Sequence, residues 1–182
     1  VKVPSQVIVL CILGFFLYPC CQLFHSHEAL LVVERGLGSP AEAGMASSAY
    51  TLSGIVAGVI VAPLMKVFKK HAPASTFVCA LLGLVVYAMA QSVMMLCLAG
   101  FLIGLAYQTF TPFGGMGAAN FSNAMGMAFN MALCNASMSL GQALSPFTTS
   151  VLGSLVGGSM TGMIWIGVVG MAVVTVAGFV YF

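Results

Sequence analysis

The sequence contains 182 residues, of which 61% are hydrophobic and 4% are charged, with a net charge of +2. Soluble domains carry about 25% charged residues, so the five basic and three acidic residues of this chain cannot cover a surface that faces water. The composition excludes a soluble globular domain, offers no basic face for nucleic acid, and indicates a surface that faces lipid.

Six apolar segments are long enough to cross a bilayer, because a spanning helix needs about 20 apolar residues, with a range of about 17–25. In chain order they cover residues 5–33, 41–65, 74–90, 93–111, 121–152 and 161–182. We therefore predict an all-α membrane protein in which residues 1–182 form one bundle of six transmembrane helices.

The first segment is longer than a simple span, and Pro19 in its middle removes one backbone hydrogen bond, so we expect a kink there. A turn follows, and Pro40 is suited to the first position of the second helix with Ser39 as its N-cap. Residues 91–92 alone connect the third and fourth segments, which predicts a tight antiparallel hairpin.

Glycine spacing predicts two close helix contacts. Gly54 and Gly58 share one helix face, as do Gly100 and Gly104, and glycines four residues apart let another helix approach closely. The fourth helix is expected to end at Pro112. The Gly-rich residues that follow, 113–123, are expected to form a loop, with a partly helical segment along the membrane surface as the alternative.

The basic residues predict the orientation of the chain in the membrane. No Asp, Glu, Lys or Arg follows residue 71, so one basic loop dominates the topology. Lys2 falls on the same side as this loop in a count of six helices, and Arg35 is the basic residue on the opposite side. By the positive-inside rule both termini and the loop face the cytoplasm. The loop contains Lys66, Lys69, Lys70 and His71.

Three stretches resemble one known family. Residues 61–70, VAPLMKVFKK, are similar to a degenerate copy of the motif Gly-x-x-x-Asp-Arg-x-Gly-Arg-Arg. The three basic positions match, whereas Val61 and Phe68 replace the two glycines and Met65 replaces the aspartate. Residues 34–44 and 140–147 are similar to an outer turn and to a Gly/Pro segment of the same family. With six spans and both ends inside, the chain resembles the C-terminal half of a bacterial major facilitator superfamily transporter.

The resemblance implies a secondary active transporter that moves a small organic solute by alternating access between two six-helix bundles. The partners would be the lipid bilayer, the substrate, and a missing N-terminal six-helix half or a second copy, in a multi-pass protein of the plasma (inner) membrane. The many Met and Phe residues and the lack of buried charge favour drug-like efflux. No enzymatic activity, catalytic residue or cofactor is expected.

Glu28 is the candidate proton-coupling residue, because an ionisable side chain within a spanning segment is a functional hypothesis by default. It also lies about 35 Å from the cytoplasmic end of its helix, at 1.5 Å per residue. The competing expectation is therefore a solvated position at the outer rim. His25, His27 and Glu28 lack further ligands for zinc, so no metal site is expected.

Uncharged polar residues within the spans are the candidates for a substrate cavity. The alternative is that they form hydrogen bonds between helices, worth about 0.6 kcal/mol each on average. The basic loop is interpreted as a topology signal that also attracts lipid headgroups. The cavity candidates are Tyr18, Gln22, His25, Gln108, Asn130 and Asn135.

The sequence leaves two other classes of membrane protein to consider. The length and helix count equally fit the six-helix substrate-binding membrane subunit of a vitamin importer, although the basic motif and Pro146 argue against it. An intramembrane serine protease would need Gly-x-Ser-Gly and a buried His. Here Thr51 replaces the first glycine, and no His follows residue 71.

Overall fold

The computed structural model describes residues 3–181, apart from the side chain of Lys70. Within these residues the regular structure is helical, which confirms the all-α prediction. The elements are α1 (Ser5–Glu34), α2 (Pro40–Phe68), a short 3₁₀ turn η1 (Lys69–His71), α3 (Ala72–Ala88), α4 (Val93–Asn120), α5 (Met127–Ala143), α6 (Ser145–Leu155) and α7 (Met160–Tyr181).

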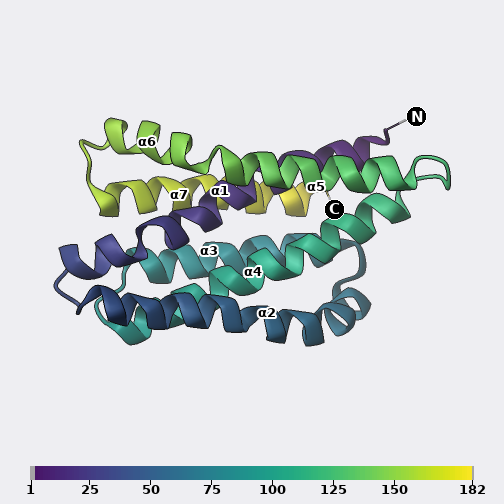
Figure 1. The fold of residues 1–182 in the computed structure, drawn as a ribbon. Helices are drawn as coiled ribbons and strands as arrows, with labels where there is room; N and C mark the ends of the chain where they lie inside the picture. Colours follow the sequence, from purple (N-terminus) through teal and green to yellow (C-terminus); the bar gives the residue numbers. More distant parts are fainter. Residues whose placement is uncertain (1–2, 182) are drawn as a thin grey trace.

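The helices lie side by side and successive spans run in opposite directions (Figure 1). The start of α1 and the end of α7 lie toward the end of the bundle that carries η1, which we call the basic end. The opposite end carries the turns at 35–39, 89–92 and 156–159 and lies beside Glu34 and Glu42, and we call it the acidic end. The start of α1, the end of α7 and the basic loop thus lie at one end of the bundle, and their cytoplasmic orientation stays a prediction.

Four described helices, α1, α2, α4 and α7, are long and apolar enough to cross a membrane, and α3 is a shorter apolar helix of 17 residues. The chain is therefore a multi-pass membrane protein in contact with the lipid bilayer. The prediction of one continuous fifth helix over residues 121–152 is wrong. Its middle is divided between α5 and α6 at Leu144, because Pro146 starts a new helix in the first turn of α6, where its missing N–H is not needed.

The loop predicted at 113–123 is also wrong over most of its length. Helix α4 does not end at Pro112 but continues to Asn120. Gly114 and Gly115 are buried in this last part, and a Cβ atom at Gly114 would collide with the side-chain methyl of Met138 in α5. The glycines form part of α4 because their lack of a side chain lets α5 pack closely against the helix, as in other membrane helix pairs.

Local signals position two helix starts as predicted. Ser39 is the N-cap of α2 and Pro40 its first residue, and the carboxylate of Glu42 accepts a 2.6 Å hydrogen bond from the Ser39 backbone N–H. Ser92 caps α4 by accepting a 3.3 Å hydrogen bond from the N–H of Met95. The connection between α3 and α4 is accordingly a tight hairpin.

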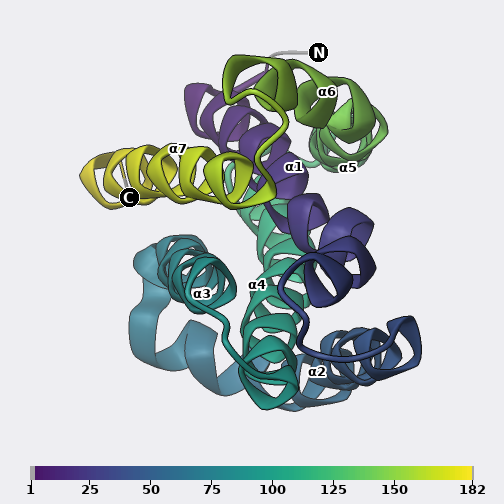
Figure 2. The same cartoon turned by 90° about the vertical axis from the view of Figure 1, so that its left-hand side faces the viewer.

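Many of the helix contacts recur when α1, α2 and α3 are exchanged for α4, α5 and α7, which we call the two trios. Helix α2 packs on α4, and α5 packs on α1. Helix α3 likewise packs on α4 and α7 on α1, while α1 contacts α4 and α3 contacts α7; among the described residues, the contact of α1 with α3 has no comparable counterpart between α4 and α7. Consequently α1 and α4 lie at the centre, with α2 and α5 as flanks (Figure 2).

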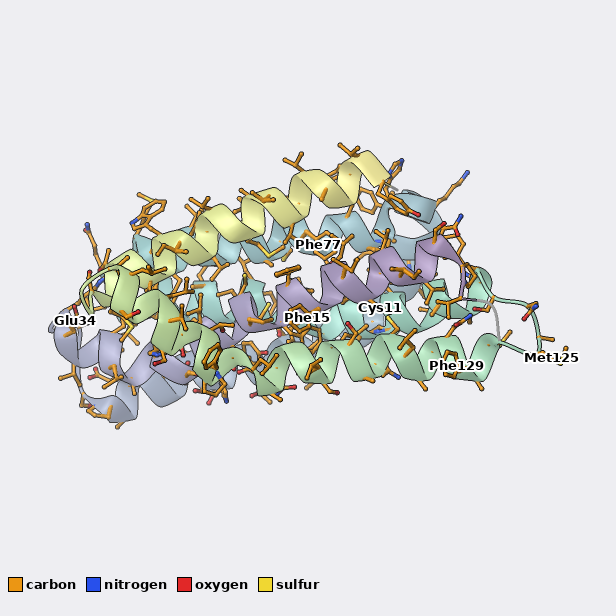
Figure 3. The ribbon with its side chains drawn as sticks, turned by 90° about the horizontal axis from the view of Figure 1, so that it is seen from above. Cys11, Phe15, Glu34, Phe77, Met125 and Phe129 are labelled. Carbon is orange, nitrogen blue, oxygen red and sulfur yellow. The ribbon has the colours of Figure 1, made fainter. Side chains whose placement is uncertain are left out.

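The contact between α1 and α5 depends on backbone exposed by Pro19, which lies inside α1. Proline has no N–H, so the carbonyl of Phe15 lacks its partner within the helix. Gly141 of α5 packs directly against this carbonyl, and a Cβ atom there would collide with it. One turn earlier Ser137 donates a 2.6 Å hydrogen bond to the carbonyl of Cys11. Figure 3 shows Cys11 and Phe15 on α1 where it runs beside α5.

The contact between α2 and α4 is built on the predicted glycine pair of α4. A Cβ atom at Gly100 would meet the carbonyl of Ala46, and one at Gly104 would collide with the carbonyl of Tyr50. The prediction for the other pair holds for Gly54, which faces the Gln108 side chain, whereas no atom lies near Gly58. The close crossing of α2 over α4 therefore requires glycine, which has no side chain, at residues 100 and 104 of α4.

Arg35 joins three elements at the acidic end. Its guanidinium donates hydrogen bonds of 3.0 Å to the Ala88 carbonyl, 2.8 Å to the Ala90 carbonyl and 2.9 Å to the Thr161 hydroxyl. The carbonyls at the end of α3 have no helical partner, so the side chain caps that helix and holds it to α1 and α7.

We predict that Gly104→Ala destabilises the protein while Gly58→Ala does not. The added methyl at residue 104 must push α2 away from α4, and such overpacking costs about 1–3 kcal/mol. The matched change at residue 58 meets open space. Thermal unfolding in detergent, followed by the fluorescence of Trp165, measures both. Equal unfolding temperatures for the two variants would contradict the proposed helix contact.

Candidate functional site

Three tyrosines from three helices meet on one side of the bundle. Tyr18 of α1 and Tyr107 of α4 have ring centroids 4.4 Å apart, and Tyr50 of α2 lies 6.0 Å from Tyr107. We call Tyr18, Tyr50 and Tyr107 the tyrosine cluster. Tyr18 is buried within the hydrophobic core, and the half-buried Tyr50 and Tyr107 pack against that core at its edge.

Hydrogen bonds extend the cluster to a fourth helix. The Tyr18 hydroxyl lies 2.7 Å from the Thr111 hydroxyl of α4, and the Tyr107 hydroxyl donates a 3.2 Å hydrogen bond to the Gln142 side-chain oxygen of α5. Thr111 and Gln142 are exposed. The site therefore combines aromatic faces, hydroxyls and an amide, all uncharged, contributed by both trios of helices.

Tyr18 and Tyr107 lie near the middle of their helices. Tyr18 follows Ser5 by 13 residues and precedes Glu34 by 16, and Tyr107 lies 14 residues after Val93 and 13 before Asn120. With a rise of 1.5 Å per residue and a hydrocarbon core about 30 Å thick, these positions fall near the bilayer midplane. A polar group at this depth needs a partner, water or a ligand.

Three predicted cavity residues adjoin the cluster. The ring of His25 lies 5.6 Å from that of Tyr50, and the exposed His25 is two turns above Tyr18 on the same face of α1. The half-buried Gln22 lies between them on that face. The Gln108 amide lies over Gly54, where it fills the space beside α2.

Asn130 and Asn135 lie apart from the cluster. Asn130 is fully buried at the basic end, and its amide donates a 2.7 Å hydrogen bond to the Ser122 hydroxyl, which holds the start of α5 to the preceding turn. Asn135 is exposed on the face of α5 that bears Gln142, about 10 Å nearer the basic end by helix rise. The structure therefore brings neither amide to the tyrosines.

Glu28 is buried rather than solvated, although it lies toward the acidic end of α1. Its side chain is only 7% exposed, because α2 covers it and the Ser47 hydroxyl donates a hydrogen bond to Oε1. The other carboxyl oxygen, Oε2, is buried without a partner, as is the hydroxyl of Tyr87 in α3. By helix rise Glu28 lies about 15 Å from Tyr18 toward the acidic end.

Tyr50, Tyr107, Thr111 and Gln142 were missed as site residues by the sequence analysis. Each is an ordinary residue of an apolar helix when read alone, and only the packing of α2, α4 and α5 around α1 brings them together. A usable signal was present, because Tyr107 directly precedes Gln108 at the middle of its span.

The chain matches no model of a known protein family, and a search of curated proteins finds no match.

We predict that the tyrosine cluster faces water rather than lipid. Cysteine reacts with maleimide as the thiolate, which forms in water and not in hydrocarbon. Thr111→Cys should therefore react with a membrane-impermeant maleimide at least about five times faster than Val176→Cys, an exposed position on α7, once the labelling of the parent chain is subtracted. Equally slow labelling of both positions would place the cluster against lipid.

Proposed function

We propose that this chain is a half-bundle of a secondary active transporter of the major facilitator type, which moves a small organic solute by alternating access. The observation that carries the proposal is the tyrosine cluster with its bonds to Thr111 and Gln142, an uncharged polar surface at mid-depth. Secondary transporters bind their substrates near the midplane, between structural repeats.

The crossed pairing of the two helix trios supports this assignment. Transporter halves of this type contain two three-helix repeats of inverted topology, and such repeats produce reciprocal contacts of the kind made by α2 with α4 and by α5 with α1. Residues from both trios then share one site at the interface of the repeats, as the tyrosine cluster does.

The interruption between α5 and α6 gives further support. Gln142 lies two residues before Leu144, where the helix is divided. Discontinuous helices beside a midplane site are a feature of many secondary transporters, because the interrupted backbone offers polar groups to the substrate. The bond from Tyr107 to Gln142 links this interruption directly to the cluster.

The residues at the cluster indicate the chemistry of the solute. No Asp, Glu, Lys or Arg side chain belongs to it, so hydroxyls, an amide and aromatic faces favour a neutral or amphiphilic organic molecule of the drug-like class. Glu28 is the proposed proton-coupling group, because its buried carboxyl has one oxygen without a partner. A carboxyl in such a position binds and releases a proton when its surroundings change.

A second bundle is part of the proposal. Thr111 and Gln142 beside the cluster are exposed, and α2 buries only Ala43, Ala46, Ser53 and Ala57 inside this chain. The opposite wall would come from an N-terminal six-helix half or from a second copy, in the plasma (inner) membrane. Export is the proposed direction.

We predict that Tyr107→Phe weakens transport of a lipophilic dye such as rhodamine 6G. The change keeps the ring and removes the hydroxyl, and a lost hydrogen bond of this kind is worth about 1 kcal/mol, or about fivefold in the half-saturating concentration. Dye extrusion from energised cells expressing the protein provides the measurement. Thr175→Val is the matched control, because it removes a hydroxyl from α7, which contributes nothing to the cluster. Equal kinetics in all three proteins would contradict the site.

We predict that Glu28→Gln abolishes extrusion driven by a proton gradient but preserves exchange of dye across vesicles without a gradient. Glutamine keeps the shape and can still accept the hydrogen bond from Ser47, whereas it cannot carry a proton. Glu34→Gln, at the exposed end of α1, is the control and should behave as the parent protein. Gradient-driven extrusion that survives Glu28→Gln would remove Glu28 from the coupling mechanism.

A further inference from the structure

Opposite charges occupy opposite ends of this bundle. The three acidic residues, Glu28, Glu34 and Glu42, belong to α1 and to the start of α2 at the acidic end. Lys66 and Lys69 lie at the far end of α2, and Lys70 adds another positive charge to the same segment of the sequence. No acidic residue follows Glu42 anywhere in the sequence, so the chain itself offers no counter-charge at the basic end.

The basic end also contains a recess. A cavity of about 70 Å³ lies where α1, α2 and α4 meet, with Lys69 and Asn120 as its polar lining residues. Apolar side chains, including Leu10, Phe113 and Phe121, form much of the rest of its wall. A charged group beside an apolar wall, at the end of a spanning helix, matches the layer of the bilayer where headgroups meet acyl chains.

The backbone at Lys69, which lines the recess, is strained. Its φ is 48° and its ψ is −117°, a conformation that suits glycine and that side chains rarely adopt. Among residues 3–181 it is the single position other than glycine with a positive φ. Strain of this kind is retained where the surrounding structure needs the side chain in one place.

Exposed apolar residues adjoin the lysines. Val67 is 72% exposed and Phe68 is 43% exposed, and both lie between Lys66 and Lys69 in the sequence. The end of α2 thus presents positive charges together with apolar side chains that the bundle does not cover. This combination fits an amphiphile better than a soluble anion, because each half of the ligand finds a matching surface.

We infer that the basic end is a binding site for one anionic phospholipid. Lys66 and Lys69 bind the phosphate of its headgroup, Asn120 offers its amide at the recess, and Val67 and Phe68 contact the upper part of its acyl chains. The charge of the occupant follows from the absence of any acid at this end, and its amphiphilic character follows from the apolar wall. Basic pockets between spanning helices on the cytoplasmic side bind such headgroups elsewhere.

The test is lipid binding to the purified protein in a neutral detergent. Native mass spectrometry counts bound phosphatidylglycerol against phosphatidylcholine with identical acyl chains, and Trp165 fluorescence records the unfolding temperature with each lipid. Phosphatidylglycerol should bind at least about tenfold more tightly and raise the unfolding temperature. Equal binding of the two lipids overturns the inference.

Variants assign the site within the chain. Each lysine near an anionic headgroup contributes about fivefold in affinity, so Lys66→Gln with Lys69→Gln should weaken phosphatidylglycerol binding about 25-fold, while Lys66→Arg with Lys69→Arg retains it. Lys69→Gly also removes the charge but relieves the backbone strain. It should unfold at a higher temperature without lipid and still bind phosphatidylglycerol about fivefold more weakly.

Two further results would overturn the inference. Unchanged phosphatidylglycerol binding in the double glutamine variant would place the lipid elsewhere on the protein. Displacement of the lipid by millimolar inorganic phosphate would identify an anion site that needs no acyl chain.

Discussion

The close approach of α2 to α4 is the constraint on which the rest of the bundle depends. Gly100 and Gly104 provide no side chain at the crossing, so the backbone of α2 lies directly on α4. The hydrophobic effect does not drive helices together within lipid, so close van der Waals contact must stabilise their association instead. This one contact brings Tyr50 to Tyr107 and places Ser47 above Glu28. The composition of the candidate site therefore depends on the close packing of α2 against α4.

The bundle separates its chemistry by depth. Charged residues lie toward the ends, whereas the middle contains tyrosines, hydroxyls and amides whose mutual hydrogen bonds satisfy groups that lipid cannot. Glu28 differs from the other acids of the acidic end because its carboxyl is buried, with one oxygen unpartnered. An ionisable group buried within a spanning helix is costly, which is why Glu28 is the residue chosen for the proton-coupling proposal.

Sequence reasoning succeeded where the signal is local. The N-cap at Ser39, the hairpin at residues 91–92 and the glycine pair of α4 each depend on residues within one or two turns. It failed at the prolines, because Pro112 lies within a continuous helix whereas Pro146 starts a new one, and tertiary contacts decide between these outcomes. The burial of Glu28 and the tyrosine cluster likewise require helices that are distant in the sequence. Of the candidate site, the face of α1 that bears Tyr18 and His25 was predictable, and its partners on α2 and α5 were not.

Arg35 has a mechanical consequence. One guanidinium bonds to the end of α3, to the turn before α4 and to α7, so the two trios are fastened together at the acidic end. Helix α6 has only two buried residues, Ser145 and Thr149, and it adjoins the break at Leu144. Bending at the junction of α5 and α6 would therefore disturb few buried side chains of α6, and it would take place two residues from Gln142.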